Sequence, residues 1–579
     1  MSWRRILLSL ASVALLAALA LLGAGCGSAP SGSSIDPANA VPASAALYAG
    51  ATVRPEGSLQ KAASTAGRKL SHQADPYLRL LGALQTPGSS APNFDKDVAP
   101  WLGPRAGVFL SAADSSGQAA VGRLLTLVEQ GLIGGSSAKG SFPFAVHSVE
   151  GAIVLDTRDT AKARAYLATL AKRAGAHSAS YRGVSYQVAN GIAFGIVTRL
   201  AVIGTEPALR QVLDTTSGGG LSLAHSPAYA KLQASAPAGA LAHLYANPGA
   251  LSEAGHGAPA QGSPALLALL AGQRLLNVSL VPSASSFSLD LDAVAPSTGA
   301  GGGGLLAGGE QAAQALGELP GESWLALGLG DVGKTLAANP QALQGLGSLG
   351  SLLSGSNPSA SATGLNVNGL LEGLLKPLRA LGSGSAASRR ELTRWIGSAG
   401  VFASGSGLLE LTGGIVLDST DPALSRSAVA KLATILRQGG GSVATASIAG
   451  TDAAVSARLS GLPVVLDIAD GRDASGNTKF VIGIGEQSVR AALRPSSTLS
   501  GAASLGTAAA ALGQGVQPSL LVEFPTLLGL LEGIGLSEDP TVSPFVPYLR
   551  SLSTLSGGGK DLGNGIERFR LVLGLQGSG

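Results

Sequence analysis

Residues 151–156 read Gly-Ala-Ile-Val-Leu-Asp, and residues 413–418 read Gly-Gly-Ile-Val-Leu-Asp. Each is a short apolar run with β-branched residues, which is typical of a buried strand. Asp159 follows the first run, and Asp421-Pro422 follows the second; both are favoured helix starts. The sequence therefore predicts the same strand-then-helix unit twice, which indicates an α+β fold.

Further short matches recur in the same order around these two runs. They indicate two tandem homologous domains, residues 41–297 and 311–579, each with a largely antiparallel sheet and packed helices. The Gly-rich residues 298–310 are the predicted linker. The matches are Val41-Pro42 with Leu319-Pro320, Trp101-Leu102-Gly103 with Trp395-Ile396-Gly397, and Glu206 and Arg210 with Glu486 and Arg490.

The amino-terminal segment has the pattern of an export signal. Arg4 and Arg5 precede an uncharged run, Ile6–Leu22, and small residues then lead to Cys26, which is the only cysteine of the chain. This order resembles the bacterial lipoprotein signal, in which the cysteine is acylated and becomes the first residue after cleavage. We expect a signal peptide at residues 1–25, lipidation at Cys26 and a flexible tether at residues 26–40.

An uncleaved membrane helix is the alternative interpretation of this segment. The 17 residues of Ile6–Leu22 are at the lower edge of the length that spans a bilayer. That interpretation leaves the small residues and Cys26 unexplained. We therefore expect the protein on the outer face of the cytoplasmic membrane, with the membrane as a partner through its lipid anchor.

Composition excludes several classes of protein. Hydrophobic residues make up 45% of the chain, enough for packed cores, and 39 basic against 35 acidic residues give a net charge of +4. Nucleic-acid binding depends on clustered Lys and Arg, and no basic cluster is longer than Arg389-Arg390. If Cys26 is acylated, no free thiol remains for disulfides, thiolate metal sites or thiol catalysis. We expect no nucleic-acid partner.

A family resemblance rests on the start of the first predicted domain. Val41-Pro42-Ala43, the run through Tyr48 and the motif Arg54-Pro55-Glu56-Gly57 resemble an uncharacterised domain family. Its members are secreted and lipid-anchored proteins of high-GC Gram-positive bacteria. The resemblance implies export and anchoring, and it implies no catalytic residue, ligand or reaction.

One motif in the second domain satisfies the phosphate-loop pattern. Residues 328–335 read Gly-Leu-Gly-Asp-Val-Gly-Lys-Thr, in which bare backbone amides and Lys334 would hold phosphates. The corresponding loop of the first domain, residues 53–57, has Pro55 and Glu56 where amides are needed, and glycine is abundant throughout. We therefore interpret the motif as structural and expect no nucleotide partner. The overlapping Gly-x-Gly-x-x-Gly pattern lacks the acidic residue that a dinucleotide site needs.

Two groups of potential metal ligands are also present. The acidic stretch Asp467–Asn477 resembles the start of a calcium loop but lacks its glycine and its terminal Glu; a solvated hairpin and a calcium site stay open as interpretations. The histidines show no metal-ligand spacing. They are His72, His147, His177, His225, His243 and His256.

The recurring carboxylates Asp156, Asp418, Glu206 and Glu486 are expected where a strand leads into a helix amino terminus, a place at which an anion is favoured. The recurring Trp101 and Trp395 are expected in the cores. With no catalytic constellation and no cofactor motif, we predict a non-enzymatic binding or structural protein whose partner is an unknown envelope protein or lipid. The alternative is a carrier or sensor of an apolar ligand, suggested by the Leu-rich stretches 266–276 and 370–381; a hydrolase is a third possibility.

Overall fold

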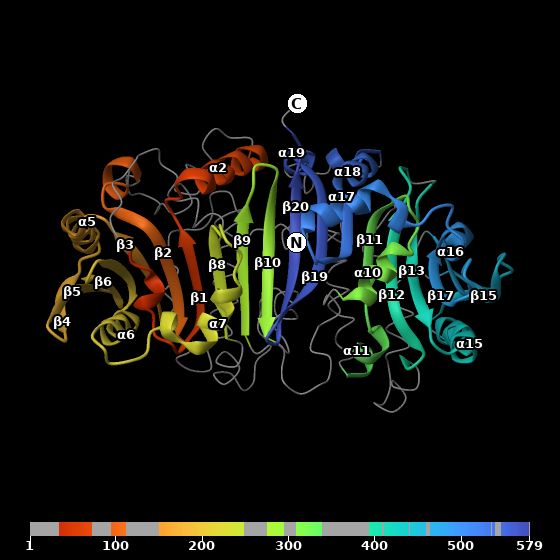
Figure 1. Ribbon diagram of the computed structural model, residues 1–579, viewed down its shortest axis with the longest axis horizontal. Coiled ribbons are helices and arrows are strands. Elements are labelled where there is room, and N and C mark those ends of the chain that lie inside the picture. The colour runs from red at the N-terminus through yellow and green to blue at the C-terminus, as the bar shows by residue number, and fades with distance from the viewer. Residues whose placement is uncertain are drawn as a thin grey trace. The chain divides into compact units, whose positions relative to one another are not determined.

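A computed structural model gives the fold of the chain (Figure 1). It describes residues 34–71, 94–111, 150–247, 275–294, 309–338, 393–407, 410–438, 440–458, 464–533, 535–538, 543 and 546–577. These residues form two compact units, one within Leu7–Pro296 and the other within Ser297–Gly579. Both combine helices with antiparallel strands. The predicted α+β class is therefore confirmed.

The first unit contains ten described strands, all paired antiparallel within the unit. Their order across the sheet is β4-β5-β6-β7-β3-β2-β1-β8-β9-β10. The strands are β1 (Ala45–Thr52), β2 (Leu102–Ser111), β3 (Glu150–Thr157), β4 (His177–Tyr181), β5 (Val184–Ala189), β6 (Ile192–Val197), β7 (Leu200–Thr205), β8 (Ala242–Ala246), β9 (Leu275–Pro282) and β10 (Ser286–Val294).

Two α-helices of this unit begin at side-chain caps. The Asp159 carboxylate accepts a hydrogen bond from the backbone N–H of Lys162, and Thr205 caps the helix that begins at Glu206 in the same way. The helical segments are η1 (Pro37–Asn39), α2 (Gly57–Ser71), η2 (Phe94–Val98), α5 (Thr160–Arg173), α6 (Glu206–Thr216), η3 (Leu223–His225) and α7 (Pro227–Ser235).

The second unit repeats this strand order. It runs β14-β15-β16-β17-β13-β12-β11-β18-β19-β20. The strands are β11 (Ser323–Leu329), β12 (Ile396–Ser404), β13 (Thr412–Ser419), β14 (Ser442–Thr445), β15 (Thr451–Arg458), β16 (Val465–Arg472), β17 (Thr478–Ile484), β18 (Gln517–Glu523), β19 (Leu552–Gly563) and β20 (Ile566–Leu575).

The helix after β13 also starts at its predicted signal. Asp421 accepts hydrogen bonds from the backbone N–H groups of Ala423 and Leu424, and the following helix starts at Pro422. The helical segments are α10 (Glu310–Gly317), α11 (Val332–Ala338), α15 (Pro422–Gln438), α16 (Gly485–Leu493), η4 (Leu499–Gly501), α17 (Ala503–Leu512), α18 (Phe524–Gly533), η5 (Leu536–Glu538) and α19 (Val546–Arg550). The equal strand order supports a duplication, and common ancestry stays a prediction.

The apolar runs 151–156 and 413–418 lie at corresponding places in the two units. Ile153 of β3 lies opposite Val108 and Ile203, and Ile415 of β13 lies opposite Val401 and Ile482. Each run is thus a central strand, as its apolar pattern predicts. Each unit has a core on this sheet, with Trp101 buried in the first and Trp395 buried in the second.

Candidate functional site

Two aspartates occupy the same place in the two units but have different neighbours. Asp156 of β3 lies opposite Leu200 of β7, and Asp418 of β13 lies opposite Lys479 of β17. Both lie within a strand, because α5 begins only at Thr160 and α15 only at Pro422. Each therefore lies at the expected strand-to-helix junction, four positions before the helix begins. Glu206 and Glu486 lie in the first turns of α6 and α16.

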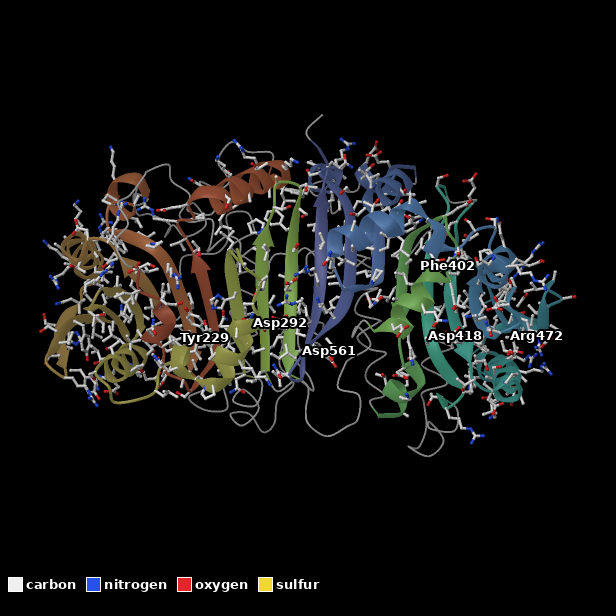
Figure 2. All side chains as sticks on the ribbon, in the orientation of Figure 1. Tyr229, Asp292, Phe402, Asp418, Arg472 and Asp561 are labelled. Carbon is white, nitrogen blue, oxygen red and sulfur yellow. The ribbon has the colours of Figure 1, made fainter. Side chains whose placement is uncertain are left out.

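Lys479 is the buried centre of an ion network in the second unit, and its carboxylate partners are partly exposed. Its residue is 6% exposed, and its Nζ donates to Glu318 Oε2 at 2.5 Å and to Asp418 Oδ1. Asp473 Oδ2 lies 3.8 Å from the same nitrogen, and Ser398 donates to Asp418 Oδ2. Burial lowers the pKa of Lys479, but the hydrogen bonds to Asp418 and Glu318 outweigh burial, so the pKa is raised. The ammonium group is therefore held charged (Asp418 is labelled in Figure 2).

Asp156 has no lysine opposite it in the neighbouring strand. It is fully buried, and neither carboxylate oxygen makes a hydrogen bond to a described residue. Arg199 Nη2 lies 3.7 Å from Oδ1. Burial raises the pKa of Asp156, while the nearby N–H of Ile35 and the charge of Arg199 counteract part of that rise. The first unit therefore keeps a carboxylate that costs free energy to ionise.

A buried cluster of aromatic side chains distinguishes the first unit. Tyr48 of β1, Tyr229 of α7 (labelled in Figure 2), and His243 and Tyr245 of β8 pack together, with ring centroids 5.3 to 6.0 Å apart. Tyr229 Oη lies 2.8 Å from His243 Nε2. Burial lowers the pKa of His243 to about 4 and raises those of the three tyrosines. The histidine is neutral and the tyrosines are protonated at neutral pH, so the cluster carries no charge.

The second unit fills the corresponding space with a helix. Ala326 takes the place of Tyr48 in the strand register, because it lies opposite Phe402 as Tyr48 lies opposite Phe109. Helix α10 packs on β11, β12 and β18 there. A Cβ on Gly328 would lie 1.9 Å from the Ala312 carbonyl oxygen. The aromatic cluster thus replaces a helix, which explains its burial without a ligand.

The glycines of the phosphate-loop pattern have packing roles. Gly328 lies in β11 against α10, and a Cβ on Gly333 would lie 2.2 Å from the Ile396 carbonyl oxygen. Lys334 is exposed and pairs with Asp331 at 2.8 Å. These contacts account for the glycines as the structural interpretation requires. The absence of a nucleotide partner stays a prediction.

The acidic stretch Asp467–Asn477 does not converge on one point. Asp467 accepts from Ser456, and Asp470 accepts from Ser425 Oγ at 2.5 Å. Asp473 closes the turn between β16 and β17 by accepting from the N–H groups of Ser475 and Asn477, both at 2.9 Å. No group of His, Cys, Asp or Glu side chains arranged for a metal occurs among the described residues. The geometry favours the hairpin over the calcium site.

The remaining expected residues fall into three groups. Trp101 and Trp395 are buried as predicted, and His177 is exposed on β4. His225 Nδ1 lies 2.7 Å from Ser222 Oγ. Outside the described residues lie Cys26, the signal peptide 1–25, His72, His147, His256, the stretch 370–381 and all but the last two residues of 266–276.

The described chain starts in a segment that is part of the first unit. Asp36 caps η1 and forms an ion pair with Arg105 at 2.6 Å. Pro37, Ala38 and Ala40 are buried. The predicted flexible tether 26–40 is therefore too long at its end, because apolar residues within the small-residue stretch pack on β2 and β3.

The fold, the Lys479 network and the aromatic cluster define an α+β protein of two units. Its described buried polar groups mostly contact one another. The match to a family model, "Protein of unknown function (DUF3352)", covers residues 6–557, and the chain belongs to that family. The family description assigns no activity. No curated protein is similar to the chain. No described helix is long and apolar enough to cross a membrane.

Solved structures of one protein resemble part of the chain. Crystal form I of TP0453 has a TM-score of 0.26 and 11% identity and covers 46% of this chain and 81% of its own. Crystal form III has a TM-score of 0.25 and 10% identity, with the same coverage. Similarity at this level supports no conclusion about function.

Sequence reasoning missed the Lys479 centre and the aromatic cluster. Lys479 is an isolated lysine that directly precedes the apolar residues Phe480–Ile482 of a strand. A lysine in such a place is the signal that could have predicted a paired buried charge. The aromatic residues come from three separated elements. Only the pairing of β1 with β8 brings Tyr48 beside Tyr245.

Proposed function

We propose that the protein is lipid-anchored through Cys26 on the outer face of the cytoplasmic membrane and acts there as a non-enzymatic binding or structural component of the cell envelope. The observation that carries the proposal is the order of Arg4-Arg5, the apolar run Ile6–Leu22 and the single Cys26. Membership of a family without an assigned activity is compatible with it.

The described polar residues support the non-enzymatic part. Lys479 is held by carboxylates, His243 by Tyr229, and the recurring Glu206 and Glu486 by Arg210 and Arg490 at 2.7 and 2.9 Å. An enzyme needs an acid, base or nucleophile that can reach a substrate. Lys479 and His243 are instead occupied by contacts within the fold, and each of the two glutamates, although partly exposed, is paired with an arginine.

Metabolic labelling with an alkyne fatty acid tests the anchor. We expect label on the protein and its recovery in the membrane fraction, and we expect Cys26→Ser to lose the label and to be released or to stall unprocessed. Ser28→Ala is the matched control in the same segment and keeps both properties. Full membrane retention of Cys26→Ser with unchanged labelling would contradict the proposal.

Affinity capture from envelope fractions, combined with analysis of extracted lipids, identifies the bound component. A reproducible protein partner supports a binding or structural role. Lipid recovered in stoichiometric amounts would instead indicate carriage of an apolar ligand. Turnover of envelope substrates by the purified protein would refute the non-enzymatic assignment.

A further inference from the structure

Two arginines of the first unit lie beside one another at the loop before β2. Arg54 Nη1 donates to the carbonyl oxygens of Ala99 and Leu102, both at 3.1 Å. Arg158 donates to the same Ala99 oxygen from Nη2 at 2.6 Å and to Pro100 from Nε at 3.2 Å. Because they share one acceptor, the two guanidinium groups are neighbours, and carbonyls hold both in place.

These two like charges have no carboxylate of the described part of the chain in contact with them. Among the described residues, neither Arg54 nor Arg158 forms an ion pair within 4.0 Å, and Glu56 acts on Arg54 only at longer range. Burial, and then the positive charge of Arg158, lower the pKa of Arg54. Each guanidinium has five N–H donors, and the carbonyls use only some of them. Donors and charge are therefore left for an anion.

The second unit shows that the fold does not need these arginines. The backbone N–H of Arg158 donates to the backbone carbonyl of Trp101. The backbone N–H of Thr420 donates in the same way to the carbonyl of Trp395, so Thr420 takes the place of Arg158. In the place of Arg54, the backbone of Gly333 packs on the oxygens of Thr393 and Ile396. The same junction is closed there without a charged side chain.

The site lies at the end of the first unit where the chain enters it. Arg105, the partner of Asp36, lies opposite Thr52, two residues before Arg54. Asp36 lies ten positions after Cys26, and a chain of that length reaches at most about 35 Å. A lipid attached at Cys26 therefore keeps this end of the unit near the bilayer surface.

We infer that Arg54 and Arg158 form a binding site for a phosphate group. Guanidinium forks match phosphate oxygens in geometry and charge, and pre-oriented arginines lose little entropy on binding. The membrane source, a phospholipid headgroup, rests on the proposed lipid anchor; the site itself does not. Free phosphate is the other source of the same chemistry.

Calorimetry on the full chain in non-ionic detergent tests the site with two probes, dihexanoyl phosphatidylglycerol and inorganic phosphate. We expect binding of one or both, weakened at least about tenfold in Arg54→Gln and in Arg158→Gln, since a hydrogen bond to a charged group contributes about 1.5–3 kcal/mol. Arg164→Gln removes an exposed charge of α5 from the same unit and is the matched control. If the two glutamine variants lose affinity only for the lipid probe, the site binds a lipid headgroup. If they lose affinity only for inorganic phosphate, the site binds the free anion.

Two further variants keep the inference falsifiable. Arg158→Lys retains the charge without the fork, and we expect intermediate affinity with unchanged thermal unfolding. Cys26→Ser should bind both probes like the unaltered chain, which separates this site from the lipid anchor. No binding by the unaltered chain, or equal binding by both glutamine variants and the control, would overturn the site.

Discussion

Lys479 lies opposite Asp418 in the second unit, and Leu200 lies opposite Asp156 at the same place in the first. The two units thus neutralise this carboxylate in two ways: the second supplies Lys479 across the strand pair to a partly exposed Asp418, and the first supplies Arg199 at 3.7 Å to a buried Asp156. The two units are natural controls for each other, because their strand orders agree while these side chains differ.

Lys479→Met should destabilise the second unit. Removing one partner of a fully buried ion pair costs about 3–5 kcal/mol, and the partial exposure of Asp418 and Glu318 reduces the expected loss to about 2 kcal/mol. Urea unfolding measures it. A double-mutant cycle with Asp418→Asn should give a coupling of about 1–2 kcal/mol. A coupling near zero would show that the pair does not stabilise the fold.

Asp156→Asn should stabilise the first unit at neutral pH by about 1 kcal/mol, because the amide is not charged in the apolar environment. The raised pKa of Asp156 means that the folded state binds a proton more tightly than the unfolded chain. Stability from this group is therefore present below about pH 4 and is lost as pH rises through the folded pKa. The gain from Asp156→Asn should shrink in acid.

Asp159→Asn is the control with the opposite sign. Hydrogen bonds from Lys162 lower the pKa of Asp159, so its contribution is present at neutral pH and is lost as pH falls. Urea unfolding at pH 3.5 and 7 compares the two variants. An Asp156→Asn gain that is equal at both pH values would contradict the assignment of a buried, uncompensated carboxylate.

His243 should make the first unit sensitive to acid. Its folded pKa of about 4 is below the value of about 6.5 for an unfolded histidine. Its contribution is present above about pH 6.5 and is lost as pH falls toward 4. Thermal unfolding of His243→Gln should lack this step, while His177→Gln, on an exposed strand, should retain it. An unchanged acid profile in His243→Gln would refute the assignment.

Tyr229→Phe should destabilise the first unit at neutral pH by about 1–2 kcal/mol, because it leaves the buried Nε2 of His243 without its hydrogen bond. Urea unfolding checks this value. Tyr166→Phe is the control, since Tyr166 packs on Trp101 through its ring. Equal, small changes in both variants would show that the Tyr229 hydroxyl does not stabilise the cluster.

The fold class could be predicted from local sequence patterns, whereas most side-chain contacts could not. The runs 151–156 and 413–418 and the caps Asp159 and Asp421 each depend on neighbouring residues. Lys479 meets Glu318 across 161 positions. Such pairs depend on strand register, which one sequence does not reveal.

Gly328→Ala should destabilise the second unit by about 3 kcal/mol or more, since overpacking against backbone is not relieved by a side-chain rotation. The new Cβ would lie 1.9 Å from the Ala312 oxygen, whereas at Gly330 the nearest atom lies at 3.4 Å. Gly330→Ala should therefore stay within about 0.5 kcal/mol of the unaltered chain. Both glycines lie in the stretch 328–335 and belong to its Gly-x-Gly-x-x-Gly pattern, so urea unfolding of the two variants separates packing from ligand binding. Equal stability, with nucleotide binding lost in both, would restore the phosphate-loop interpretation.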